Sequence, residues 1–306
     1  RHTNLVTFIG ACLEYPHVCI LTEGCPKGSL EDLLANDNVK LGWDFKFSLL
    51  KDICRGMEYL HRSSIGSHGR LKSSNCLVDN RWTCKISGFG VPKIRYDGPR
   101  KSLDPAEGFV YKTTNLFWTA PELLTPKVKT LNDVRNGTPL GDVYSFGIIM
   151  SEVCTRKSPY FSEIYFLTAE DILLLIRDKE DPLAEKAKMQ WYESGGDTTF
   201  ELRPYVDEEH LPEELAAKED CSKLMQSAWS RNPALRPSFK LMRITLDEIY
   251  PVKGELMDNL IKMLEKYSTD LEGIVLERTR ELQAEKAKTE LLVSQILPKK
   301  VVEDLK

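Results

Sequence analysis

One stretch of the chain, GDVYSFGIIMSEVCTR from Gly141 to Arg156, is apolar around nearly its whole helical circumference in its middle. A surface helix keeps one polar face, whereas a helix that is apolar all round is buried on every side. Such a helix needs a large core around it, and 306 residues with 42% apolar content can build one. The sequence therefore predicts a large globular domain around this helix.

The segments before this helix predict both strands and helices. NLVTFIGACLEYPHVCILTE holds two β-branched, apolar runs around a turn at 14–16, which predicts a hairpin of buried strands. Ser29 can cap a short helix in GSLEDLLAN, and apolar residues spaced by one, three and four predict a long amphipathic helix over WDFKFSLLKDICRGMEYLHR. NCLVD and TCKISGFG predict a second, smaller hairpin around 80–81.

Charge and cysteine usage exclude several classes of function. The net charge of -4, from 42 basic and 46 acidic residues, gives no electrostatic case for binding nucleic acid or an anionic membrane surface. The 8 cysteines form no C-x-x-C pair and no zinc-ligand spacing. We expect reduced thiols in a cytosolic compartment, and no metal site. No run approaches the ~18 apolar residues of a membrane span.

The character of the chain changes after about Pro251. Only Gly273 interrupts the stretch 255–297, charges alternate in sign along it, and Pro298 ends it, which predicts one long solvated helix. Apolar residues follow a three-four seam that contains a stutter, and the second half of the seam carries polar Arg278, Glu285 and Thr289. Two interpretations stay open: a marginal two-stranded coiled coil, or a single charged helix packed on a neighbour.

A further constraint comes from HGRLKSSNCLVD, residues 68–79. The phosphotransfer loop H-R-D-L-x-x-x-N uses its aspartate to accept the proton of the substrate hydroxyl and its asparagine to hold magnesium. His68, Leu71 and Asn75 lie on this frame, but Gly69 and Arg70 stand where arginine and aspartate are expected.

Other parts of the same pattern follow in order along the chain. They are Gly88-Phe89-Gly90 in place of D-F-G, Ala120-Pro121-Glu122, Asp142 in DVYSFG, and Arg236-Pro237. Together they resemble the protein-kinase fold over roughly residues 5–250. The fold class implied is α+β: the end of a small lobe, a mostly helical large lobe, and then a long coiled-coil helix.

The residues that phosphoryl transfer needs are changed. Gly88 has no carboxylate for magnesium, and the Arg70 cation accepts no proton and repels a metal ion. Gly69 also lacks the guanidinium that grips a phosphate on the activation segment. We therefore predict a pseudokinase with no catalytic residue, in which Gly69, Arg70 and Gly88 are degenerate positions.

The resemblance implies structural and nucleotide-binding roles for the remaining motif residues. Asp142 is expected to bond the backbone of the loop and Glu122 to pair with Arg236, while His68, Phe89 and Gly90 are structural. The hinge would be Thr22, Glu23, Gly24 and Cys25, with Leu77 as the floor of the pocket and Lys72 and Asn75 as supporting residues. Binding of ATP without transfer stays open.

Three strings point to one family: HGRLKSSNCLVD, WTAPELL and the tail LLVSQILPKKVVEDLK. They resemble the kinase-homology domain and linker helix of the membrane receptor guanylate cyclases. The resemblance implies a pseudokinase domain over 1–250 with an incomplete small lobe, a dimerisation helix over 251–298, and at 299–306 the start of a linker into a cyclase domain that is not present.

The same resemblance implies an activity and a location for the parent protein. The parent would be a single-pass membrane receptor that makes cyclic GMP from GTP with magnesium or manganese. This chain would be its cytoplasmic portion, a homodimer through 255–297, with ATP as an allosteric ligand. A scaffold pseudokinase without a cyclase would explain the lost catalytic residues but not the Ile-Leu-Pro stop, and an active protein kinase ranks third.

Overall fold

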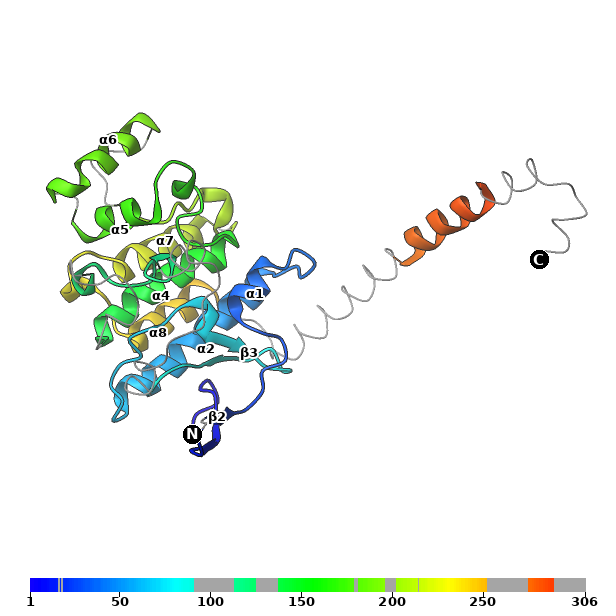
Figure 1. Ribbon diagram of the computed structural model, residues 1–306, viewed down its shortest axis with the longest axis horizontal. Coiled ribbons are helices and arrows are strands. Elements are labelled where there is room, and N and C mark those ends of the chain that lie inside the picture. Colours follow the sequence, from blue (N-terminus) through cyan, green and yellow to red (C-terminus); the bar gives the residue numbers. More distant parts are fainter. Residues whose placement is uncertain are drawn as a thin grey trace, which may run out of the picture. The chain divides into compact units, whose positions relative to one another are not determined.

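The computed structural model describes residues 1–15, 17, 19–90, 113–124, 137–178, 181–195, 202–213, 215–251 and 275–288. The chain divides into two units, Arg1–Pro251 and Val252–Lys306, and each is described by itself (Figure 1). The labelled α-helices of the first unit are α1 (Leu30–Ala35), α2 (Trp43–Arg62), α4 (Pro139–Thr155), α5 (Ala169–Arg177), α6 (Glu185–Glu193), α7 (Leu215–Ala228) and α8 (Phe239–Ile249). Its strands are β1 (Phe8–Cys12), β2 (Cys19–Thr22), β3 (Cys76–Val78) and β4 (Cys84–Ile86). Short 3-10 turns are η1 (Ser73–Asn75), η2 (Pro121–Leu123), η3 (Glu163–Tyr165), η4 (Pro182–Ala184), η5 (Glu208–His210) and η6 (Pro233–Leu235).

Helix α4 is the buried helix that the sequence predicts. Its residues from Gly141 to Cys154 are all buried, and the Thr138 hydroxyl caps its first turn by accepting from the Gly141 amide at 2.9 Å. Gly147 lets α7 approach, because a Cβ at this position would lie 3.1 Å from the Cβ of Ala228. The prediction of a helix in the middle of a large core is confirmed.

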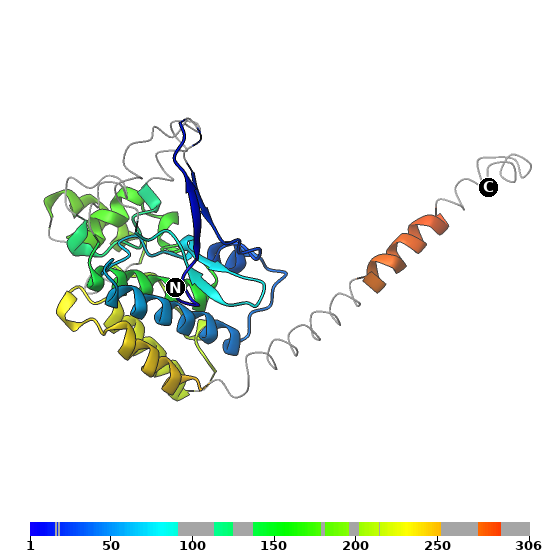
Figure 2. The same cartoon turned by 90° about the horizontal axis from the view of Figure 1, so that it is seen from below.

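Helix α2 confirms the predicted amphipathic helix and links the core to the end of the unit. Its residues Leu49, Leu50, Ile53, Met57 and Leu60 are buried, and it lies against α8 (Figure 2). Lys51 Nζ donates to the backbone carbonyl of Tyr250 at 2.8 Å and lies 2.9 Å from the Asp247 carboxylate. The last residues of α8 are thus held against the middle of α2.

The β3–β4 hairpin is also as predicted. Its two strands pair Cys76 with Ile86 and Val78 with Cys84, and all four of these side chains are buried. The N-terminal segment runs beside β4, where Val6 donates its amide to the Ile86 carbonyl at 2.9 Å. This hairpin therefore belongs to the core of the first unit.

The β1–β2 hairpin corrects one expectation. The two strands pair as predicted, with Cys12 opposite Cys19, but they are not buried: Phe8 is 60% exposed and Ile9 66% exposed. Among the described residues these strands form a two-stranded sheet, so no third strand extends it. An apolar, β-branched run indicates that a segment favours the strand conformation. It does not indicate whether another element covers that strand.

In the second unit the structure describes one helix, residues 275–288, whose side chains are all exposed. Arg278 and Glu281 form an ion pair within it at 2.8 Å. The rest of the predicted helix over 255–297 and the linker at 299–306 lie outside the described residues, so the coiled coil stays a prediction. No helix in the described parts of the chain has the length and apolarity needed to cross a membrane. All eight cysteines are free thiols.

Candidate functional site

The loop from His68 to Asn75 is held by one buried carboxylate in the first turn of α4. Asp142 Oδ2 accepts the His68 amide at 2.7 Å, and Oδ1 accepts the Gly69 amide at 2.8 Å. His61 Nε2, at the end of α2, lies 2.9 Å from the same carboxylate. The Asp142 side chain is 1% exposed, so its role is to position the loop backbone, as the kinase resemblance implies.

Gly69 has a backbone reason to be glycine. Its φ is +72°, in the left-handed region that side chains disfavour. A Cβ on Gly69 would lie 2.9 Å from the backbone nitrogen of Gly137, so the loop passes close to the segment that leads into α4. The arginine of the kinase pattern would not fit here unless one of these segments moved.

Two other polar side chains of the loop, Asn75 and Lys72, form hydrogen bonds that help to hold the loop in place. Asn75 Nδ2 donates to the backbone carbonyl of Arg70 at 2.7 Å, which fixes the orientation of the Asn75 side chain within the loop. Lys72 Nζ donates to Asn115 Oδ1 across to the segment before η2. Arg70, at the position of the proton acceptor, is half-buried. These contacts organise the loop and provide no base.

The Gly88-Phe89-Gly90 motif lies directly behind the loop. His68 Nε2 is 2.8 Å from the Ser87 carbonyl, and the His68 ring meets the Phe89 ring edge to face at 6.4 Å. Gly88 has a φ of +81° and offers no carboxylate. Within the residues that the structure describes, no group of three or more His, Cys, Asp or Glu side chains could hold a metal ion.

A buried glutamate beneath the loop was not anticipated from the sequence. Glu152 of α4 accepts from the Ser73 hydroxyl at 2.8 Å and from the Trp118 indole nitrogen at 2.7 Å. Burial raises the pKa of its carboxyl to about 8, although both hydrogen bonds act to lower it. An acidic residue within an otherwise apolar helix was the available signal, because buried carboxyls are nearly always partnered.

The predicted hinge lies between β2 and α1, above β3. Glu23 accepts the Thr7 amide at 2.7 Å, and Lys85 of β4 pairs with its carboxylate at 2.9 Å. Burial alone would raise the pKa of Glu23, but the hydrogen bonds from Lys85 and Thr7 hold it below the usual value. The Glu23 side chain therefore connects the hinge to the N-terminal segment and to β4.

The backbone edge of the hinge is available for a ligand. Leu77, half-buried in β3, forms a β-bridge with Ser29 just past the hinge, so floor and hinge lie together as expected. Among the described residues, no hydrogen bond engages the Glu23 carbonyl or the Cys25 amide, while the Cys25 carbonyl accepts from Gly28 at 3.1 Å. These free groups fit an adenine edge, whereas Gly88 and Arg70 do not fit a metal-bound triphosphate.

The expected Glu122–Arg236 pair is present and structural. Arg236 donates to both carboxylate oxygens of Glu122, at 2.6 and 2.8 Å, and also to the carbonyls of Leu140 and Ser230. Its side chain is 0% exposed and stacks over the Tyr144 ring at 5.2 Å. The pair joins η2 to the segment before α8.

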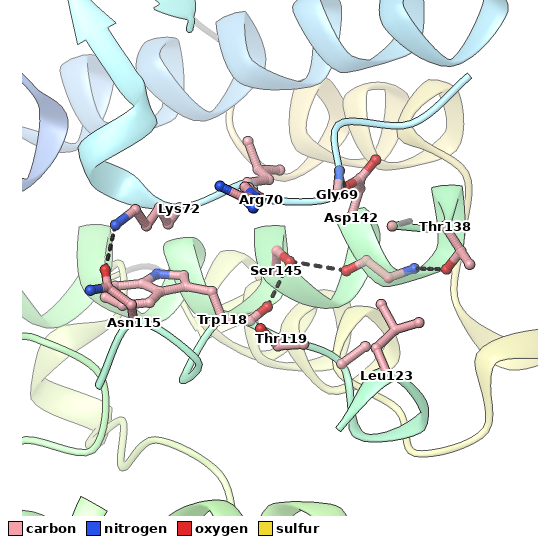
Figure 3. A pocket seen from close by; sticks show the side chains of 14 residues that line it. Gly69, Arg70, Lys72, Asn115, Trp118, Thr119, Leu123, Thr138, Asp142 and Ser145 are labelled. Atoms are coloured by element: carbon pink, nitrogen blue, oxygen red, sulfur yellow. Dashed lines mark hydrogen bonds between the residues drawn. The ribbon is translucent and has the colours of Figure 1, made fainter. Parts of the chain in front are cut away.

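A small pocket, partly open to solvent, lies beside the loop (Figure 3). One wall is the loop itself, Gly69 to Lys72, and the opposite wall comes from the segments before and within η2 and from the start of α4. The lining side chains include Arg70, Lys72, Asn115, Trp118, Thr119, Leu123, Thr138, Asp142 and Ser145. The loop and the η2 segment thus enclose the place where a kinase would bring its protein substrate.

This geometry is that of a protein-kinase domain. A family model described as protein tyrosine and serine/threonine kinase matches residues 1–246, and the chain belongs to this family.

Over its whole length the chain is also similar to several receptors. It is 38% identical over 307 residues to atrial natriuretic peptide receptor 2 of Homo sapiens, 38% over 308 residues to receptor-type guanylate cyclase gcy-28 of Caenorhabditis elegans, and 38% over 307 residues to the resact receptor of Arbacia punctulata. The matches cover 100% of this chain but 26%, 22% and 28% of those proteins, so the chain spans roughly a quarter of their length.

Proposed function

We propose that the chain is the regulatory pseudokinase and dimerisation region of a receptor guanylate cyclase, and that it relays ligand binding to cyclic GMP synthesis by a cyclase domain of the parent protein. The similarity to gcy-28 over the full chain supports the cyclase assignment. The parent would be a single-pass membrane receptor, with this region on the cytoplasmic side.

One observation carries the non-catalytic assignment. Arg70 occupies the position of the proton acceptor, and Gly88 occupies the position of the magnesium-binding aspartate. Phosphoryl transfer consists largely of positioning and charge neutralisation by metal ions. A guanidinium in place of the base neither accepts the proton nor admits the metal.

Two measurements test this proposal. The full chain is incubated with labelled ATP, magnesium and a protein acceptor, and we expect no more transfer than in a heat-denatured sample. Stoichiometric phosphate transfer would overturn the pseudokinase assignment. Separately, the parent protein is expected to convert GTP to cyclic GMP, and a parent without this activity would favour the scaffold alternative.

Nucleotide binding at the hinge is a further part of the proposal. The unengaged Glu23 carbonyl and Cys25 amide support adenine recognition, and the missing metal ligand at Gly88 argues against a magnesium requirement. ATP would then act as an allosteric ligand. We expect ATP to bind the chain equally well with magnesium and with a chelator. Binding that needs magnesium, or no binding at all, would contradict this part.

The helix over 255–297 is proposed to form the homodimer. Its polar seam residues make two registers similar in free energy, so a small change above the helix would shift their populations. Replacing Arg278, Glu285 and Thr289 by leucine is expected to lock one register and remove the ligand response of the parent cyclase. Leucines at Arg280, Gln283 and Ala287, outside the seam, are the matched control. An unchanged response in the seam variant would exclude register switching.

A further inference from the structure

The β1–β2 hairpin places two cysteines directly opposite each other. Cys12 ends β1 and Cys19 begins β2, and they form the last residue pair of the ladder before the turn. Directly opposite residues of an antiparallel pair project from the same face of the sheet. Both side chains are free thiols, Cys19 exposed and Cys12 half-buried. The hairpin therefore presents two thiols side by side, within reach of solvent.

The spacing of this pair suits a disulfide. Opposed Cα atoms in an antiparallel ladder lie about 4.5 or 5.5 Å apart, and a disulfide spans Cα separations of about 4.4 to 6.8 Å. The opposed Cβ atoms, about 4.5 to 5.5 Å apart, need to approach to about 3.5 to 4.5 Å. A shift of about an ångström is therefore enough. The ladder, which has exposed side chains and an irregularity between Phe8 and Gly10, can accommodate it.

The other six cysteines, all of which the structure describes, are not both paired and accessible. Two further pairs share thiol hydrogen bonds, but all four of their side chains are buried: Cys76 with Cys84, and Cys154 with Cys221. Buried thiols are shielded from oxidants in solution. Cys54 is buried as well, and Cys25, in the hinge, is half-buried and lies outside both strands. Cys12 and Cys19 are thus the pair that an oxidant reaches first.

The end of the hairpin away from the turn is already fastened by hydrogen bonds. The Glu23 amide donates to the Thr7 carbonyl at 3.0 Å, and the Thr7 amide donates to the Glu23 carboxylate at 2.7 Å. At the turn, the His17 amide donates to the Glu14 carbonyl at 2.8 Å. Because an isolated two-stranded hairpin is only marginally stable, a covalent link beside the turn would stabilise the end that lacks contacts with the core.

We propose that Cys12 and Cys19 are a redox-sensitive pair, which a hydroperoxide joins in a reversible disulfide across the end of the hairpin. One thiolate attacks a peroxide oxygen, the oxygen–oxygen bond breaks, and a sulfenic acid forms. The second thiolate attacks this sulfur, and the sulfur–oxygen bond breaks. With hydrogen peroxide, both oxygens leave as water and take up the two thiol protons. The two sulfurs are oxidised and the peroxide is reduced by two electrons.

The disulfide would fix the register of β1 and β2 immediately before the hinge that begins at Glu23. A disulfide in a reducing compartment is usually transient and redox-sensing, and exchange with a dithiol returns this one to the free thiols. The proposal goes beyond the proposed function. It depends on neither a cyclase nor a nucleotide, because both cysteines belong to this chain.

The test uses the full chain, reduced and then exposed to hydrogen peroxide, with the remaining thiols blocked by alkylation. Cleavage after Glu14 and Glu23 places Cys12, Cys19 and Cys25 on separate peptides. We expect the Cys12 and Cys19 peptides to be recovered as one linked product, which a dithiol separates. Cys12→Ser and Cys19→Ser should each abolish this product. Cys25→Ser is the matched control and should retain it.

Hydrogen exchange measures the effect on the hairpin. In the oxidised chain we expect the amides of β1 and β2 to exchange at least about tenfold more slowly, because a cross-link over a short loop restricts the opened hairpin. Exchange in α4 should not change, and Cys12→Ser treated with peroxide should exchange like the reduced wild type. Equal rates in the oxidised and reduced wild type would overturn the stabilising effect.

Other outcomes would overturn the pair itself. They are a link that includes Cys25, a link between two copies of the chain on a non-reducing gel, oxidation of Cys19 to a sulfinic acid without a link, and reaction of the buried pairs before this one. Thermal unfolding confirms that each serine variant is folded. Should one of the two serine variants unfold, the other decides, because each leaves one cysteine of the pair without its partner.

Discussion

Two sets of kinase-motif residues in the first unit differ in what they retain. Asp142, Glu122 and Arg236 keep both the residue types and the contacts of the kinase pattern, whereas Arg70 and Gly88 do not keep the residue types. The first set is bonded inside the protein, and removing one partner leaves a buried group without its hydrogen bond. The second set occupies the positions of the proton acceptor and of the metal ligand in the kinase pattern. The difference indicates that the retained residue types are those whose polar contacts hold the fold together, because losing such a contact lowers stability.

The largest effect that would test this comparison is expected at Arg236. Arg236→Ala leaves Glu122 and the carbonyls of Ser230 and Leu140 without their donor. Losing the buried Arg236 side chain leaves two backbone carbonyls without a donor, at about 1 to 3 kcal/mol each, whereas water can solvate the exposed Glu122 carboxylate. The free energy of unfolding in urea measures it. Arg62→Ala, whose side chain is 65% exposed and paired to Glu58, is the control and is expected to cost less than about 1 kcal/mol. Similar losses in both would remove the distinction.

A smaller loss is expected at Asp142. In Asp142→Asn one oxygen remains as an acceptor, while the new amide faces a backbone N–H that it cannot satisfy. We expect a loss of about 2 kcal/mol in the free energy of unfolding. Asp37→Asn, at an exposed position after α1, is the control and should have almost no effect. No loss at Asp142 would mean that the loop is held by other contacts.

The pH dependence of stability sharpens the comparison at Glu152. Because burial raises its pKa to about 8 from the usual 4.5, its protonated form is favoured in the folded protein. The contribution is therefore complete below about 4.5 and is lost as the pH rises through about 8. Relative to Glu152→Gln, the wild type should lose stability over this range by at most about 1.4 kcal/mol per pH unit. Unfolding curves at successive pH values measure the difference, and parallel curves would contradict it.

The smallest effect concerns the second set. Gly88 has a φ of +81°, so Gly88→Ala is expected to cost about 1 kcal/mol through backbone strain. Gly24→Ala in the hinge, where an added Cβ would meet nothing within 4 Å, is the control and should cost close to nothing. Thermal unfolding of both variants measures the difference. Equal costs would mean that backbone conformation is not what favours glycine at position 88.

Much of the fold could be predicted from local signals. Ser29 caps α1 through a capping box with Asp32, and the apolar spacing in α2 matches its buried face. In that helix Phe47 is also fully buried, and its ring stacks on Tyr250 at 4.9 Å. A helix that packs against two elements buries a wider face than the apolar stripe that is found from the periodicity of its sequence.

Parts of the site could not be predicted. The Arg156 guanidinium donates to the carbonyls of Leu34, Asn36 and Val39, which connects the end of α4 to the end of α1. Ser73 and Trp118 meet at Glu152 in the same way. These contacts join residues that are far apart in the chain, and no pattern of residue spacing in the sequence predicts them.

The sequence by itself determined the order of motifs, the loss of a base at Arg70 and of a metal ligand at Gly88, and the separation of a globular part from a charged helix, because these depend on residue type and local pattern. Only the tertiary structure decided that Gly69 is required by the approach of Gly137, that the Asp142 carboxylate is occupied, and that Arg70 and Lys72 line the same small pocket. Close approach, burial and shared cavities arise from packing between distant segments, and a one-dimensional pattern does not contain them.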